Sequence, residues 1–200
     1  MLGVIALGAT IMTSTSVAHL DALVGRGLRS ATGVLSPHAS SMVSALGGSD
    51  FVLPLTAGCV LLLSLLRHWR GALTVVMAVG TTQVVVHLIK TVVERPRPRL
   101  NGTVAEASGF SFPSAHSATA MALYATITFI AARACRGPAR AAIAATGVVL
   151  VAAIGTSRVL VAAHYPIDVV AGWLTGAALV VASTLLVRRL GSPVPQTNPV

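Results

Sequence analysis

The feature that most constrains this chain is a succession of long apolar runs that contain almost no charged residues. About 20 apolar residues in a helix cross the hydrocarbon core of a bilayer, and most of these runs contain 17–21 residues. We therefore predict an all-α, polytopic membrane protein in which about six transmembrane helices form a bundle. The runs cover residues 2–18, 51–66, 71–89, 115–132, 141–157 and 167–187.

The composition agrees with a membrane protein. Hydrophobic residues make up 54% of the 200 residues and charged residues 10%, whereas soluble domains have about 25% charged residues. This length fits one domain, which we place at residues 1–190. Residues 191–200 are predicted to be a disordered C-terminal tail. The first run has no basic segment before it, so a cleaved signal peptide is not favoured.

Basic residues orient the predicted helices. Short Arg-rich loops face the cytoplasm, so we predict, with the N-terminus inside, that segments 90–114 and 158–166 face outward. The net charge of +9 follows from this topology, and no nucleic-acid-binding motif accompanies it. No nucleic-acid partner is expected. Three clusters without an acidic residue form the cytoplasmic side: Arg67 and Arg70; Arg133, Arg136 and Arg140; Arg188 and Arg189.

Residues 19–50 form the longest early connection between apolar runs. Leu20, Leu23, Val24 and Leu28 recur there at helical spacing, with charged residues among them. This pattern indicates an amphipathic helix lying on the membrane. An ordered loop without a role toward lipid fits the same residues equally well.

The first of three polar motifs is KTVVERPRP at residues 90–98. Arg95 and Arg97 each precede a proline, which favours extended backbone and holds both guanidinium groups on a stiff segment. The planar fork of arginine matches phosphate oxygens, and lysine adds a point charge. Lys90 and Arg97 are therefore candidate phosphate ligands. The alternative is a basic patch that contacts anionic lipid headgroups.

The second motif is PSAH at residues 113–116. Ser114 suits the N-cap of the helix that follows, and a helix N-terminus is a ready anion site. His116 would lie in the first turn, beside the anion. The alternative is a capped helix with a histidine at the membrane interface.

The third motif is SRVLVAAHYPID at residues 157–168. Arg158 ends one run, and Asp168 follows His164 by one helical turn. A carboxylate at that distance can accept the imidazole N–H and fix the tautomer. An ordinary surface His–Asp pair is the alternative for this motif taken alone.

All three motifs lie on one predicted side of the membrane. Ionisable residues at membrane spans are costly and point to function. Three cations, two histidines, a hydroxyl and a carboxylate together support phosphoryl transfer, in which cations neutralise the oxygens of the transition state. One histidine would attack phosphorus and the other would protonate the leaving alcohol.

The patterns K-x6-RP, PSxH and SR-x5-H-x3-D, in this order over residues 90–168, resemble those of the type 2 phosphatidic acid phosphatase superfamily. This family includes membrane lipid phosphate phosphatases, polyprenyl diphosphate phosphatases, glucose-6-phosphatase and the vanadium haloperoxidases. The six-span layout extends this resemblance over the chain, and the arginine distribution predicts that the active site lies at the outer membrane face.

The resemblance also implies the role of each matching residue. His116 looks like the general acid, His164 like the nucleophile that becomes phosphohistidine, and Asp168 like its orienting partner. Position 115 is more commonly glycine in the family, and Ala115 keeps the N–H but has less freedom at positive φ. The residues that resemble the phosphate site are Lys90, Arg97, Ser114, Ala115 (through its N–H) and Arg158.

The sequence therefore predicts a lipid phosphatase of the cytoplasmic membrane whose active site faces the extracytoplasmic side. The substrate would be a lipid phosphomonoester or diphosphate: polyprenyl diphosphate, phosphatidylglycerol phosphate or phosphatidate. Too few carboxylates lie near the site to hold Mg²⁺, so we expect catalysis without a metal or other cofactor. A lipid-to-sugar phosphotransferase could use the same residues. A non-catalytic lipid-binding or transport protein is a further alternative, but it would not need His116, His164 and Asp168 together.

Overall fold

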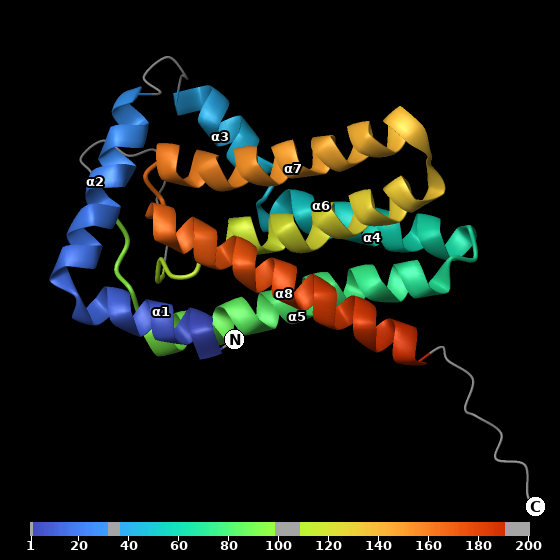
Figure 1. The fold of residues 1–200 in the computed structure, drawn as a ribbon, viewed down its shortest axis with the longest axis horizontal. Coiled ribbons are helices and arrows are strands. Elements are labelled where there is room, and N and C mark those ends of the chain that lie inside the picture. The colour runs from blue at the N-terminus through green and yellow to red at the C-terminus, as the bar shows by residue number, and fades with distance from the viewer. Residues whose placement is uncertain (1, 32–36, 99–108, 191–200) are drawn as a thin grey trace, which may run out of the picture.

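The computed structural model describes residues 2–31, 37–98 and 109–190, and this part of the chain is helical, without strands. The prediction of an all-α protein is confirmed. The predicted tail at residues 191–200 lies outside the described residues. The helices (Figure 1) are α1 (Leu2–Thr13), α2 (Thr15–Ala31), α3 (Pro37–Ala45), α4 (Ser49–Leu65), α5 (Trp69–Val93), α6 (Ala115–Ala134), α7 (Gly137–Leu160) and α8 (Pro166–Leu190).

Five helical stretches of the described chain are long and apolar enough to cross a membrane. One is His38–Leu65, which includes most of α3 and all of α4, and the others are α5, α6, α7 and α8. Each matches one of the apolar runs between residues 51 and 187, although the first ends at Leu65, one residue before the predicted end. The prediction of a polytopic helical bundle is therefore confirmed, with five candidate spans.

The first apolar run, residues 2–18, differs from the single spanning helix that we predicted. It is divided between α1 and α2, with Ser14 between them. The 12 residues of α1 extend about 18 Å at 1.5 Å per residue, which is less than the hydrocarbon thickness of about 30 Å. The break falls in a run of four hydroxyl residues, at positions 13–16, which the prediction passed over because none of them is charged. Residues 2–18 are therefore not among the five candidate spans of the described chain, and the predicted count of about six is approximate.

Helix α2 lies across one end of the bundle, roughly perpendicular to the long helices (Figure 1). Leu20 and Val24 are 60% and 54% exposed, whereas Asp21 and Gly25 on the opposite face are buried. The predicted amphipathic helix is thus present at residues 15–31. Its contact with a membrane surface stays a prediction.

Helix α6 is the centre of the bundle and packs against α4, α5, α7 and α8. Val75 of α5 and Leu123 of α6 lie in a core cluster that also includes Val52 of α4. Tyr124 and Ile154 belong to a second cluster, between α6 and α7. These contacts fix the N-terminus of α6, where the second motif lies, relative to its neighbours.

Helices α6 and α8 approach closely because α8 has glycines at the contact. A Cβ atom on Gly172 would lie 2.6 Å from the carbonyl oxygen of Ser114 and 2.9 Å from Cβ of Ser117. Small residues allow such close helix packing in membranes. The backbone N–H of Ser114 also donates a hydrogen bond to the carbonyl oxygen of Asp168 at 2.9 Å. The second and third motifs are therefore connected directly through backbone.

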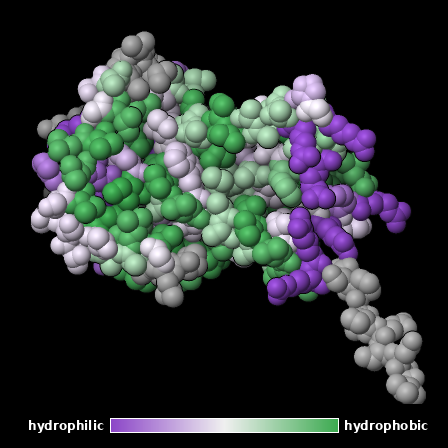
Figure 2. All heavy atoms as spheres, viewed as in Figure 1, coloured by the Kyte–Doolittle hydropathy of each residue, from purple (hydrophilic) through white to green (hydrophobic). Residues whose placement is uncertain are grey.

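The two ends of the bundle differ in chemistry. Hydrophilic side chains gather at the end formed by the α4–α5 and α6–α7 connections and the C-terminus of α8 (Figure 2). The three arginine clusters of the sequence lie in these segments. Large apolar side chains such as Leu61, Leu88, Val148 and Val181 are exposed along the helices between the ends, as expected for a surface in contact with lipid.

Candidate active site

Four helix ends and their connections form the candidate active site. The C-termini of α5 and α7 and the N-termini of α6 and α8 meet at the end of the bundle that α2 crosses (Figure 1). The structure brings the three motifs together there. His116 of the second motif is within electrostatic range of Arg97 of the first and of His164 of the third. The eight predicted residues in these segments are Lys90, Arg97, Ser114, Ala115, His116, Arg158, His164 and Asp168.

His164 lies in the short connection between α7 and α8 and is 2% exposed. Its Nδ1 atom faces Oδ2 of Asp168 at 3.5 Å, which is longer than an ordinary N–H···O hydrogen bond of about 2.7–3.2 Å. Its Nε2 atom lies 3.3 Å from Nη1 of Arg97. The imidazole is therefore oriented with one nitrogen toward a carboxylate and the other toward a candidate phosphate-binding cation.

Burial lowers the pKa of His164 to about 4, and Arg97 and Lys90 act in the same direction. The nearby carboxylate of Asp168 opposes this shift of the pKa without cancelling it. His164 is therefore neutral near pH 7, and a neutral imidazole has the lone pair that a nucleophile needs.

Asp168 lies in the first turn of α8 and is fully buried. Its carboxylate faces three polar groups. Oδ1 accepts a hydrogen bond from Nη1 of Arg95 at 2.5 Å. Oδ2 accepts one from the backbone N–H of Tyr165 at 3.0 Å and faces His164. Asp168 therefore has a fixed position from which it can orient the imidazole.

Arg95 connects Asp168 to a second buried carboxylate. Its Nη2 atom donates to Oδ2 of Asp21 at 2.8 Å, and Oδ1 of Asp21 accepts from the backbone N–H of Ile167 at 3.0 Å. Arg95 and Asp21 are each 3% exposed. Arg95 lies on the same segment as Arg97, as the sequence predicts. Its guanidinium group, however, bonds to Asp21 and Asp168 and so joins α2 to the start of α8.

Lys90 and Arg97 precede residues 99–108 in the chain, and their side chains bond to the backbone that follows these residues. Nζ of Lys90 donates to the carbonyl oxygen of Phe110 at 2.5 Å, and Nε of Arg97 donates to that of Gly109 at 2.9 Å. Nη1 of Arg97 also donates to the carbonyl oxygen of Ala163 at 2.9 Å. These bonds fix both cations beside His164.

Arg158 ends α7 and is 8% exposed. Its Nη1 atom donates a hydrogen bond to the hydroxyl oxygen of Ser44 in α3. Within the described part of the chain, its buried Nε atom has no hydrogen-bond partner. Because an unpaired buried N–H of a cation is costly, Arg158 has the capacity to donate to an anion in the site.

Ser114 is the N-cap of α6, as the sequence predicts. Its hydroxyl oxygen accepts from the backbone N–H of Ser117 at 3.4 Å and from the hydroxyl of Ser117 at 3.0 Å. Ala115 is the first residue of the helix and His116 the second. The first N–H groups of a helix have no partner within it, so this end of α6 offers backbone donors and a positive dipole to an anion.

A cavity of about 480 Å³ opens beside His116 and Arg158. Residues from α3, the α3–α4 turn and the start of α4 form its other wall, including Ser41, Ser44 and Asp50. This cavity lies next to the candidate catalytic groups.

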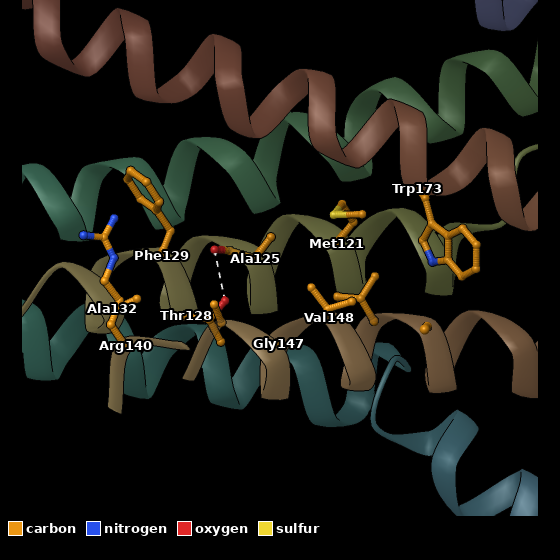
Figure 3. A pocket seen from close by; sticks show the side chains of 12 residues that line it. Met121, Ala125, Thr128, Phe129, Ala132, Arg140, Gly147, Val148 and Trp173 are labelled. Carbon is orange, nitrogen blue, oxygen red and sulfur yellow. Dashed lines mark hydrogen bonds between the residues drawn. The ribbon is translucent and has the colours of Figure 1, made fainter. Parts of the chain in front are cut away.

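A second cavity, of about 490 Å³, lies along α6, α7 and α8 (Figure 3). Its walls are mainly apolar, with Trp173 toward one end and Arg140 toward the other. It contains none of the eight predicted site residues. We assign it no part in the chemistry.

No group of three or more His, Cys, Asp or Glu side chains is placed to share a metal ion among the residues that the structure describes. The two buried carboxylates at this end of the bundle both form ion pairs with Arg95. They belong to Asp168 and Asp21. The groups that the structure gathers around His164 are a second histidine, cations and the N-terminus of α6.

Sequence reasoning missed Asp21 and Ser44 and assigned no role to Arg95. Asp21 lies on the buried face of α2, opposite the apolar residues that identified that helix. As the single acidic residue of an amphipathic helix, it could have been recognised as unusual, but its partner is 74 positions away. No sequence signal identifies Ser44, whose partner is 114 positions away.

Comparisons with known proteins agree with this geometry. The model of the PAP2 superfamily matches residues 71–192, more than half of the chain. Phosphatidylglycerophosphatase B of Bacillus subtilis (strain 168) is 29% identical over 139 residues, which cover 68% of each protein.

Two crystal structures share the fold. One is a transmembrane PAP2-type phosphatidylglycerolphosphate phosphatase from Bacillus subtilis, with a TM-score of 0.79, 23% identity and coverage of 98% of this chain and 96% of that one. The other is Aquifex aeolicus LpxE, with a TM-score of 0.68, 22% identity and coverage of 82% and 94%, respectively.

Proposed function

The chain belongs to the PAP2 superfamily and is a membrane phosphatase, and from this premise we propose that it hydrolyses a lipid phosphomonoester or diphosphate through a phosphohistidine intermediate. The observation that carries this proposal is the environment of His164. This buried imidazole is neutral near pH 7, with Nδ1 toward Asp168 and Nε2 toward Arg97.

In the first step, Nε2 of His164 attacks phosphorus and forms an N–P bond while the bond from phosphorus to the leaving oxygen breaks. Asp168 accepts the Nδ1–H, which orients the ring and stabilises the positive charge that develops on it. Arg95 keeps Asp168 ionised and in position by donating to its other oxygen. The backbone N–H of Tyr165 supports the same carboxylate.

The transferred phosphoryl group is held by cations and by the N-terminus of α6. Lys90, Arg97 and Arg158 neutralise the charge on its equatorial oxygens. The Ser114 hydroxyl and the N–H of Ala115 add donors at the positive end of the helix dipole. This arrangement supplies electrostatic stabilisation without a metal ion.

His116 protonates the leaving oxygen in the first step. In the second step it removes a proton from water, which attacks phosphorus and releases phosphate from His164. His116 thus serves first as an acid and then as a base. It can do so because it loses a proton in the first step and regains one from water in the second.

The distribution of arginines supports an orientation with the site outside the cytoplasm. The arginine clusters lie at the end opposite the site, and short Arg-rich loops face the cytoplasm. We place the protein in the cytoplasmic membrane on this basis. An impermeant thiol reagent should fail to label Cys135, beside the α6–α7 arginines, in intact cells of a Cys59→Ala strain. Labelling before permeabilisation would reverse the orientation.

The direct test is phosphate release by the purified protein in detergent from a panel of lipid phosphates. We expect release that continues in EDTA, falls with vanadate and is lost in His164→Ala. His87→Ala is the matched control, since it changes a histidine of α5 outside the site. Release by a folded His164→Ala protein would overturn the nucleophile assignment, and inhibition by EDTA would overturn metal independence.

A further inference from the structure

A cavity of about 400 Å³ lies between α5, α6 and α8 at the hydrophilic end of the bundle (Figure 2), opposite the candidate active site. Each of the three arginine clusters contributes one side chain to its wall. Arg70 comes from the first turn of α5, Arg133 from the last turn of α6 and Arg188 from the last turn of α8. Membrane topology accounts for arginines at this end, but it does not require three of them, from three helices, to surround one cavity.

The wall of this cavity is basic. His68 also lines it, and no Asp or Glu is among the described residues that do so. Like charges around one space repel each other, and an anion placed between them would turn this repulsion into attraction. Because Arg70, Arg133 and Arg188 are all exposed, a ligand has access to them.

Two of the basic side chains pack against neighbours that hold them at the cavity. A Cβ atom on Gly71 would overlap the imidazole ring of His68, so a glycine at this position lets the ring lie on the first turn of α5. The guanidinium group of Arg133 lies over the ring of Phe129, 5.7 Å from its centroid. The N-terminus of α5 begins at Trp69 and adds the positive end of a helix dipole.

The hydroxyl groups deeper in the wall do not supply donors to a ligand. Each donates to a carbonyl oxygen one turn earlier in its own helix, and they belong to Thr74, Thr126 and Thr184. The distances are 2.8, 2.6 and 2.7 Å, respectively. The donors for an anion therefore lie at the mouth, where the arginines are.

An apolar groove continues from this cavity along the membrane-spanning part of the bundle. A second cavity, of about 330 Å³, lies between α6 and α8. Val181 and Leu185 line it and are exposed on the surface of the bundle. Val180 precedes Arg188 by eight residues, which is about 12 Å along a helix. The two cavities share four lining residues, Phe129, Val180, Thr184 and Arg188.

We propose that this cavity and groove bind one anionic phospholipid of the leaflet opposite the candidate active site. Its phosphodiester headgroup would lie among Arg70, Arg133 and Arg188, and an acyl chain would lie against α6 and α8. Basic pockets between transmembrane helices on the cytoplasmic side bind anionic headgroups in this way, and in the proposed orientation this leaflet is the cytoplasmic one. The site contains none of the eight predicted residues of the candidate active site, so the bound lipid is a ligand and not the substrate.

The test is a titration of the purified full-length protein with lipid, in detergent, followed by native mass spectrometry. The probes are phosphatidylglycerol and phosphatidylcholine with the same acyl chains, so that the headgroup alone differs. One phosphatidylglycerol molecule should bind about tenfold more tightly than phosphatidylcholine. Arg133→Gln and Arg188→Gln should each weaken its binding about fivefold, because each removes one charge from the headgroup site.

Arg136→Gln and Arg189→Gln are the matched controls, since both arginines are exposed at the same end of the bundle and neither lines the cavity. Both variants should bind phosphatidylglycerol as the wild type does. Arg97→Gln removes a cation of the candidate active site and should also keep this affinity. The unfolding temperatures of the lipid-free variants show that each of them is folded.

Four results would overturn the inference. Equal losses in Arg188→Gln and Arg189→Gln would show a general attraction to the charge of this surface. Equal affinity for the two lipids would show that the arginines do not select the headgroup. A loss in Arg97→Gln alone would place the lipid in the candidate active site. Displacement of the lipid by an equal concentration of glycerol 3-phosphate would show that the ligand is a free phosphate anion.

Discussion

Arg95 lies between two buried carboxylates, Asp168 and Asp21, and its guanidinium group stacks over the ring of Tyr165 at 4.1 Å. The geometry makes one cation the partner of two anions from different helices. Because each carboxylate also accepts a backbone N–H, the group is almost fully satisfied. It is therefore a rigid support for the carboxylate that faces His164.

Arg95→Ala is expected to be one of the most damaging single substitutions in the chain. It would leave two buried carboxylates without their cation, and breaking a buried ion pair costs about 3–5 kcal/mol. Thermal unfolding in detergent, followed by circular dichroism, measures this loss. Arg26→Ala is the control, since Arg26 is an exposed arginine of α2. Equal unfolding temperatures for the two variants would contradict the bridging role.

The pH dependence of stability should carry a contribution from His164. Its pKa is about 4 in the folded protein and about 6.5 in an unfolded chain, so protonation favours unfolding. The stabilising contribution is complete above about pH 6.5, falls as the pH decreases toward 4, and changes no further below that.

Unfolding measured between pH 4 and 7 tests this sign. The decline of stability toward acid pH should be shallower in His164→Asn than in the wild type, because asparagine does not titrate. In activity assays His164 should likewise remain a neutral nucleophile down to about pH 4. Identical pH profiles of unfolding for the two proteins would show that His164 is not held neutral by the fold.

At the scale of residues, local motifs predicted candidate site residues, which the structure brings to one end of the bundle, but not the network of contacts around them. Lys90, Ser114 and His164 could be identified because each belongs to a short pattern with a chemical purpose. Asp21 and Arg95 could not be paired from sequence, because their contact depends on where α2 crosses the bundle. Ionic partners 74 positions apart leave no local signal.

At the scale of elements, the contact between α6 and α8 positions the second motif against the third. Gly172→Ala would place a Cβ atom 2.6 Å from the backbone oxygen of Ser114, so the helices would have to separate. Overpacking of this kind costs about 1–3 kcal/mol, and the shift would move Asp168 relative to His116. We expect lower kcat and lower thermal stability.

Gly58→Ala is the matched control for that substitution. Gly58 lies in the spanning helix α4, and an added Cβ there meets no atom within 4 Å. Alanine should be neutral or stabilise the helix by about 0.5–1 kcal/mol. If both alanine variants had wild-type kcat and unfolding temperature, close packing of α6 on α8 would not be needed to form the site.

The long spans α5 to α8 could be predicted from apolar length alone, because a membrane requires it. The N-terminal elements could not. A run that is apolar over residues 2–18 satisfies the composition of a span whether or not the helix continues through Ser14. Only its packing against α5 and α8 shows that α1 stays short.

At the scale of the whole molecule, the bundle separates two functions between its ends. One end carries the arginine clusters on which the proposed orientation rests, and the other collects the ionisable residues of the candidate site. Helix α2 crosses the site end with an apolar face exposed and Asp21 directed inward. We infer that this end meets the membrane surface, where a lipid phosphate would present its headgroup.

The central claim is that phosphate passes through His164, and trapping the intermediate tests it most directly. The wild type is mixed with a lipid labelled in its phosphate, quenched in alkali, in which phosphohistidine is stable, and digested for mass spectrometry. We predict label on the peptide that contains His164, lost after acid treatment and absent from His164→Asn. Phosphate release without any labelled protein, or label on another residue, would contradict the mechanism.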